Sequence, residues 1–139
     1  MKLVQSRLVN SVLLLVILLL PACATTPLKE TPVSGNPAVL VLANTARSDI
    51  AVYQYGKAAA SLERALRIEP RNARLWHDLA QVRLKEEEYQ QAESLALRSN
   101  RFAGRDDVLR SANWKLIAES RKELGNMSGA QRALEKSGN

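Results

Sequence analysis

The chain has 139 residues, a formal net charge of +6, and 46% hydrophobic but only 4% aromatic residues, which fits one small domain and excludes two. It contains one Cys and one His, so an intrachain disulfide and a zinc site built from several Cys and His ligands are excluded, and Cys-His or Ser-His-Asp catalytic relays are disfavoured. Much of the apolar content is Ala and Leu, the best helix formers, and we therefore expect an all-α protein.

Residues 1–22 have the layout of a secretory signal peptide. Lys2 and Arg7 precede an uninterrupted apolar run at positions 12–20, which is followed by Pro21-Ala22 and Cys23. The run is shorter than the roughly 20 residues that a membrane-spanning helix needs. A permanent single-pass anchor is therefore the weaker interpretation.

The sequence Leu20-Pro21-Ala22-Cys23 resembles the bacterial lipobox. The resemblance implies that the signal is removed and that Cys23 is acylated on its thiol and on its new amine. Three acyl chains exceed what stable membrane anchoring requires. Ala24 follows where an Asp would retain an enteric-type lipoprotein in the inner membrane, so the resemblance implies the outer membrane, on its periplasmic face. The alternative is an ordinary secreted protein that is cut near Ala22 and keeps a free thiol.

Residues 23–37 are predicted to form the lipidated Cys and a flexible linker, because Pro and Thr are frequent there and apolar residues are rare.

Residues 38–139 are predicted to form a helical domain. Its apolar residues recur with helical spacing, and turn and cap residues separate the stretches. In chain order, we expect a helix that ends at Glu69-Pro70, a helix capped by Asn72 that runs to about Glu87, a helix from Tyr89 to about Phe102, a helix opened by Asp106 and Asp107 that ends at Gly125, and a last helix at 127–136.

These helical stretches repeat along the chain. Tyr55 and Tyr89 are 34 residues apart, whereas Trp76 and Trp114 are 38 apart, which indicates an insertion of about four residues. A period of 34 with paired helices resembles the tetratricopeptide repeat (TPR) family. The resemblance covers roughly residues 39–137 and implies a short α-solenoid of about three helix-turn-helix repeats, in which both tryptophans pack between helices.

The turn between the paired helices differs among the three repeats. Gly125 lies in this turn in the last repeat, whereas Glu87 and Tyr53 take the equivalent places in the other two. If the turn needs a positive φ, each residue other than Gly costs free energy there.

The resemblance also implies a groove lined by outward side chains of the first helix of each pair. Helical spacing places Arg74, His77, Gln81 and Lys85 in one row, and the row from Lys115 to Lys122 beside it. We expect a basic, amphipathic groove that binds an extended or helical segment of another protein. The alternative is an ordinary solvated helix face. The candidate partner-binding residues are Arg47, Arg74, His77, Gln81, Lys85, Lys115, Glu119 and Lys122.

No pattern in the sequence indicates catalysis. His77 and Asp78 are adjacent, but neighbouring helical residues do not face each other, and no nucleophile, metal-ligand set or phosphate loop accompanies them. We therefore expect no enzyme activity, cofactor, metal or small-molecule substrate. Export would separate the chain from nucleic acid, in spite of its basic composition.

Short TPR lipoproteins of the outer membrane include activators of bifunctional peptidoglycan synthases, pilotins that escort secretins, and components of outer-membrane assembly machinery. The size and the order of lipobox, linker and repeats favour the first group. The resemblance thus implies a scaffold that binds an envelope protein, specifically a peptidoglycan synthase. The alternative is a pilotin or an accessory protein of outer-membrane assembly.

Overall fold

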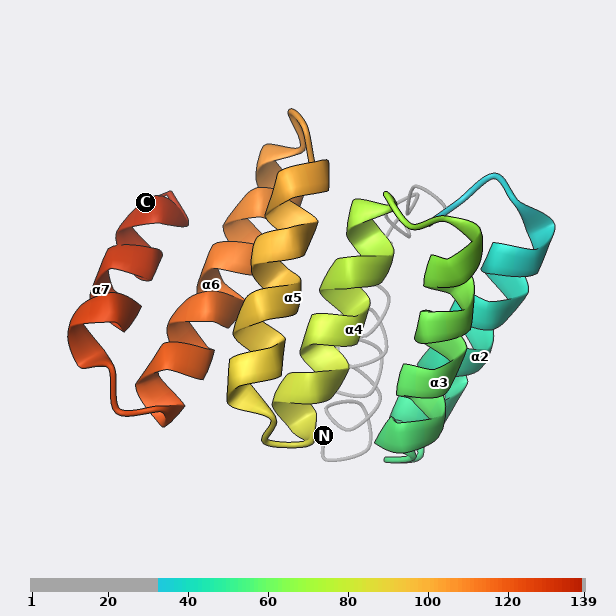
Figure 1. The fold of residues 1–139 in the computed structure, drawn as a ribbon, viewed down its shortest axis with the longest axis horizontal. Coiled ribbons are helices and arrows are strands. Elements are labelled where there is room, and N and C mark those ends of the chain that lie inside the picture. Colours follow the sequence, from blue (N-terminus) through green and yellow to red (C-terminus); the bar gives the residue numbers. More distant parts are fainter. Residues whose placement is uncertain (1–32, 139) are drawn as a thin grey trace, which may run out of the picture. The chain divides into compact units, whose positions relative to one another are not determined.

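The computed structural model describes residues 33–138. The predicted signal peptide, Cys23 and the linker up to position 32 lie outside the described residues. Within the described part of the chain, six helices follow one another as antiparallel pairs (Figure 1). They are α2 (Pro37–Ala51), α3 (Tyr55–Ile68), α4 (Ala73–Lys85), α5 (Tyr89–Phe102), α6 (Asp107–Glu123) and α7 (Met127–Lys136). The prediction of an all-α domain with three TPR-like helix pairs is confirmed.

Side-chain caps explain where the first helix of each pair begins. The side chain of Asn36 accepts a hydrogen bond from the Ala38 backbone N–H, and Pro37 occupies the first turn, where its missing N–H costs nothing. Asn72 and Asp106 cap α4 and α6 in the same way. The predicted cap at Asn72 is therefore confirmed.

The turn inside each pair needs a left-handed residue. Its φ is +60° at Tyr53, +62° at Glu87 and +77° at Gly125. These positions were equivalent in the sequence repeat, and the structure confirms that they share one backbone conformation. Only the last pair has the residue that adopts this conformation without a steric penalty.

Two hydrophobic clusters hold the pairs together. The first joins α2, α3 and α4 and contains the fully buried Leu62 and Leu75. The second joins α4, α5, α6 and α7 around Ile117. Alanines fill most of the second cluster, so that neighbouring helices approach closely. Its buried members are Ala80, Ala92, Ala96, Leu116, Ile117, Ala118 and Ala133.

The two tryptophans pack between helices, as predicted. Trp76 is half-buried against the first cluster, and its indole N–H donates to the backbone carbonyl of Pro70 over 2.9 Å. The guanidinium carbon of Arg98 lies 4.2 Å from the centre of its ring. Trp114 is half-buried against the second cluster, with the Lys136 ammonium 4.7 Å from its ring centre. A cation from the second helix of the pair thus covers each tryptophan.

The end of the predicted linker packs onto the domain. Val33 contacts the first cluster, and its carbonyl accepts a hydrogen bond from the Asn72 amide over 2.8 Å. The Ser34 hydroxyl, which is buried, donates to the Glu69 carboxylate. The sequence predicts that residues 33–37 belong to a flexible linker, because Pro and Thr are frequent in this stretch and apolar residues are rare. These contacts place them with the helical domain instead.

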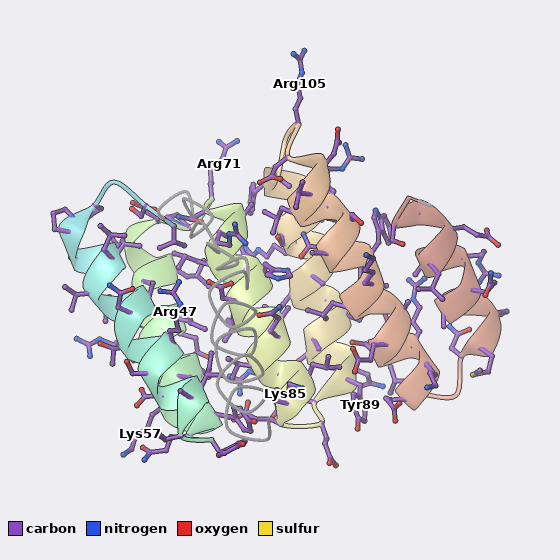
Figure 2. All side chains as sticks on the ribbon, turned by 180° about the vertical axis from the view of Figure 1, so that it is seen from behind. Arg47, Lys57, Arg71, Lys85, Tyr89 and Arg105 are labelled. Atoms are coloured by element: carbon purple, nitrogen blue, oxygen red, sulfur yellow. The ribbon has the colours of Figure 1, made fainter. Side chains whose placement is uncertain are left out.

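Turns at one end of the helices carry protruding cations. Arg71 and Arg105 stand out from the α3–α4 and α5–α6 connections, while Lys57 and Tyr89 lie toward the other end (Figure 2). None of the helices in residues 33–138 is both long enough and apolar enough to cross a bilayer.

Candidate protein-binding groove

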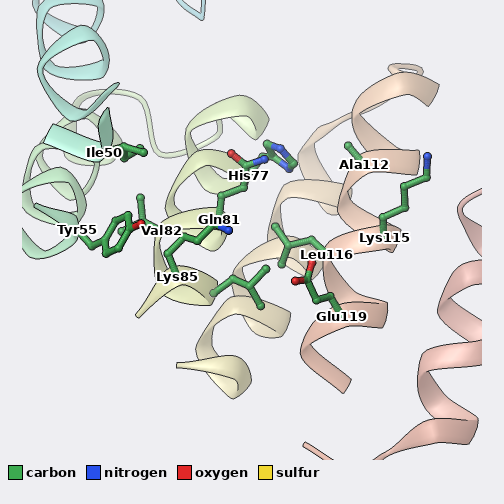
Figure 3. A pocket seen from close by; sticks show the side chains of 11 residues that line it. Ile50, Tyr55, His77, Gln81, Val82, Lys85, Ala112, Lys115, Leu116 and Glu119 are labelled. Carbon is green, nitrogen blue, oxygen red and sulfur yellow. The ribbon is translucent and has the colours of Figure 1, made fainter. Parts of the chain in front are cut away.

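A hollow of about 400 Å³ opens between the first helices of the three pairs (Figure 3). We call it the central hollow. Its walls come from α4 and α6, and its edge comes from the end of α2 and the start of α3. The residues that line it are Ile50, Tyr55, His77, Gln81, Val82, Leu84, Lys85, Ala112, Lys115, Leu116 and Glu119.

The structure brings most of the predicted groove residues together. His77, Gln81 and Lys85 line the central hollow from α4, and Lys115 and Glu119 line it from α6. Each pair of neighbours along these rows is three or four residues apart, so successive turns present them on one helix face.

Three predicted groove residues lie outside the central hollow. Arg47 on α2 and Arg74 on α4 are exposed but do not line it. Lys122 lines a second hollow of about 370 Å³ between α6 and α7, to which Lys115 and Glu119 also contribute. The groove therefore continues from the central hollow toward the last helix.

Sequence reasoning missed the apolar floor of the central hollow. Ile50, Leu84 and Leu116 provide much of it. A signal was present in the repeat itself, because Ile50 and Leu84 are 34 residues apart and Lys122 follows 38 residues later. In the last repeat this position is a Lys that lines the second hollow, so the repeat indicates a shared position but not an apolar floor.

His77 differs from the other predicted groove residues because it is 5% exposed. Its Nδ1 lies 2.7 Å from Oδ1 of Asn113 on α6. Asn113 Nδ2 donates to Ser99 Oγ over 2.7 Å and to Asn100 Oδ1 over 2.9 Å, and the Ser99 hydroxyl donates to the carbonyl of Ala73 over 2.8 Å. This buried network joins α4, α5 and α6. Nothing in the residue spacing indicates this network.

Charges next to the hollow are unevenly balanced. Burial raises the pKa of the Asp78 carboxyl above its ordinary value, and the positive charges of His77, when protonated, Arg74 and Arg47 oppose that rise. Among the ion pairs of the described residues, none includes Arg47 or Arg74. Both guanidinium groups lie close enough to the Asp78 carboxyl to lower its pKa, and Arg47 Nη1 also donates to Asn44 Oδ1 over 3.0 Å.

The groove has the chemistry of a protein-binding surface. Lys85, Lys115 and Glu119 give it charges of both signs, and the aliphatic floor gives it apolar area to bury. In residues 33–138, no three His, Cys, Asp or Glu side chains are grouped so that they could hold a metal ion. An amphipathic segment of another protein fits such a surface by its charges and its apolar side chains together.

Comparisons with known proteins identify the family. A family profile described as tetratricopeptide repeat matches residues 50–112. Among solved structures, the globular C-terminal domain of P. aeruginosa LpoP is 38% identical, with a TM-score of 0.72; the match covers 75% of this chain and 98% of that one. No curated protein sequence matches the chain significantly. The chain therefore belongs to the tetratricopeptide repeat family, with a helical domain similar to the C-terminal domain of LpoP.

Proposed function

We propose that this chain is a periplasm-facing outer-membrane lipoprotein, anchored through Cys23, whose TPR domain binds and activates a bifunctional peptidoglycan synthase. The observation that carries the proposal is the likeness to the LpoP domain, which extends over 98% of that domain at 38% identity. The sequence resembles lipoprotein activators of such synthases, of which LpoP is one. The order of lipobox, linker and repeats supports the same role.

The groove supplies the means of binding. Lys85 and Lys115 line the central hollow, and Arg47 and Arg74 lie beside it without ion-pair partners among the described residues. Their positive charge favours an acidic segment of the synthase. The aliphatic floor then buries apolar side chains of that segment, which supplies affinity that salt does not screen.

In this role the chain acts by binding alone. A ligand shifts a conformational equilibrium by the difference between its affinities for the two states. A synthase whose active conformation exposes the recognised segment would therefore be activated by a scaffold without catalytic groups. Catalysis, cofactors and metal ions have no part in the proposal.

The test uses the full chain, purified in detergent, and the synthase of the same organism. We expect Lys115→Glu and Arg74→Glu to weaken binding at least tenfold and to lower the stimulated rate of glycan polymerisation. Arg64→Glu is the matched control, because Arg64 is exposed on α3, lines neither hollow and has no ion-pair partner among the described residues. Circular dichroism verifies that all three variants fold. Equal effects of the three substitutions would contradict a role of the groove.

A second experiment separates the candidate partners. A photoreactive amino acid at Gln81, which is exposed and lines the central hollow, traps the bound protein in living cells. We expect mass spectrometry to identify a peptidoglycan synthase. Trapping of a secretin or of an outer-membrane assembly protein would overturn the proposed function in favour of a pilotin or an assembly accessory role.

A further inference from the structure

The buried network beneath the groove determines which nitrogen of His77 carries a proton. Its starting point is the backbone carbonyl of Ala73, which can only accept. The Ser99 hydroxyl must therefore donate to it, and the Ser99 oxygen must then accept from Asn113. This places the amide nitrogen of Asn113 toward Ser99 and its carbonyl oxygen toward His77. Nδ1 of His77, which lies 2.7 Å from that oxygen, must be the donor.

The contact with Ser99 decides the orientation of the Asn113 amide, because Asn100 carries an amide of its own, whose Nδ2 is buried without a partner among the described residues. The two hydrogens of Asn113 Nδ2 are directed to Ser99 Oγ and Asn100 Oδ1. Turning the amide over would place its oxygen against the Ser99 oxygen, whose only hydrogen is already donated to Ala73. The network therefore permits one arrangement of donors and acceptors.

The network does not use the other ring nitrogen of His77, Nε2. The side chain lines the central hollow although the residue is 5% exposed. Among the described residues, Nε2 has no hydrogen-bond partner. In the neutral ring with its proton on Nδ1, Nε2 is an acceptor, and it belongs to a side chain that lines the hollow.

The charges around the hollow limit the donor that this nitrogen would accept. Lys85 and Lys115 line the same hollow, and Arg74 is one turn before His77 on α4. A cationic donor would be repelled by these groups, which Glu119 in the lining and Asp78 next to His77 on α4 offset only in part. An uncharged N–H or O–H group meets no such penalty.

We propose that His77 is a specificity-determining residue, whose Nε2 accepts a hydrogen bond from an uncharged N–H or O–H of an otherwise acidic partner segment. A backbone amide, a Ser or Thr hydroxyl, or an Asn or Gln amide meets this description. The proposal rests on the proposed function for the identity of the partner. Asn113 acts behind His77 as a positioning residue, because it fixes the ring and its tautomer without facing the groove lining.

Nitrogen NMR tests the tautomer directly, because the chain contains one His. The full chain, labelled with ¹⁵N in the imidazole ring, gives one pair of ring resonances. We expect the protonated nitrogen to be Nδ1, and the Nε2 resonance to shift when the synthase is added. A proton on Nε2 in the neutral ring would overturn the proposal.

Two substitutions separate the two ring nitrogens. His77→Asn places an amide N–H near the position of Nδ1 but offers nothing at Nε2, so we expect near-normal thermal stability and about tenfold weaker binding of the synthase. His77→Gln places an amide near Nε2 but abandons Asn113. We expect it to melt at a lower temperature and to bind within about threefold of the unmodified chain.

Failure of this inference and failure of the proposed function give different results. If the unmodified chain binds the synthase and His77→Asn binds equally well, Nε2 has no role in recognition and the inference is overturned. If the unmodified chain does not bind the synthase, the proposed function is overturned, together with the occupant named here. If affinity falls in proportion to melting temperature in both variants, His77 has only a structural role and the inference is overturned.

Discussion

The contacts on the two sides of α4 are built from different side chains. Toward α2 and α3, α4 packs Leu75, Leu79 and Val82 into a cluster of large aliphatic residues. Toward α5 and α6, the cluster is mostly alanine, and the fully buried Asn113 and Ser99 lie beside it. One helix therefore joins an apolar contact to a partly polar one.

The difference shows which contact stabilises the fold and which contact defines how the helices are aligned. Burial of large aliphatic side chains is favourable but does not depend on direction, so it stabilises the first contact without defining one alignment. Alanines bury less area, and the directional hydrogen bonds of Asn113 define how α6 lies against α4 and α5. The polar contact is also the one that orients His77 toward the central hollow.

We expect the largest loss of stability from a substitution in the aliphatic first cluster. Leu75 is fully buried in the first cluster, and Leu75→Ala should lower the free energy of unfolding by about 2–5 kcal/mol, since it removes apolar contacts and leaves a cavity. Urea denaturation measures the change. Leu97→Ala is the control, because Leu97 is 40% exposed on α5. Similar losses in both variants would mean that the first cluster is not the main source of stability.

We expect a smaller loss of stability from a substitution in the buried polar network of α4, α5 and α6. Asn113→Ala removes a fully buried amide and leaves His77, Ser99 and Asn100 each without one hydrogen bond. We expect the free energy of unfolding to fall by about 2 kcal/mol. Asn44→Ala is the control, since Asn44 makes an exposed hydrogen bond to Arg47. If Asn113→Ala unfolds at the same urea concentration as the unmodified chain, the network does not stabilise the second contact.

The sequence predicted the fold better than it predicted the site. Helix boundaries depend on nearby signals, such as Asn72, Asp106 and Gly125, and these were recognised without knowledge of the packing. The groove rows on α4 and α6 were found for the same reason, because spacing within one helix decides which residues share a face. Such arguments use only residues that are close in the chain.

What the sequence could not predict depends on distances between helices. His77 and Asn113 are 36 residues apart, and nothing in their spacing indicates that α6 brings the amide to the imidazole. The ion pairs of Arg83 with Glu63, at 2.7 Å, and of Arg121 with Glu93, at 2.6 Å, were missed for the same reason. Long polar side chains form such contacts only after the apolar faces have set the positions of the helices.

The turns inside the helix pairs differ in the residue that adopts the left-handed conformation. Glu87 has a φ of +62° in the middle pair, where the last pair has Gly125. Glu87→Gly should raise the free energy of unfolding by about 0.5–1 kcal/mol, because the strain of a left-handed non-Gly residue exceeds the entropy that Gly adds to the unfolded chain. Thermal melting checks the direction. Gly125→Ala should have the opposite effect, although no atom lies within 4 Å of the added Cβ, since the strain arises from the backbone itself. An unchanged or lower melting temperature for Glu87→Gly would contradict this account of the turns.

The smallest change is expected at Asp78, which lies on α4 between the two contacts. Burial raises the pKa of its carboxyl from 3.8, and the charges of His77, Arg74 and Arg47 only partly offset the rise. Because the folded pKa is above the unfolded one, the contribution of Asp78 to stability is fully present below pH 3.8 and is lost as the pH rises through the folded pKa. Asp78→Asn keeps the shape without the charge, and it should therefore melt at a higher temperature than the unmodified chain at pH 7. The advantage should shrink as the pH falls toward 3. A lower melting temperature of Asp78→Asn at pH 7 would contradict this account. It would show that Arg74 and Arg47 stabilise the Asp78 carboxylate by more than its burial costs. Asp78 would then partly neutralise the cations beside the groove before any acidic segment binds.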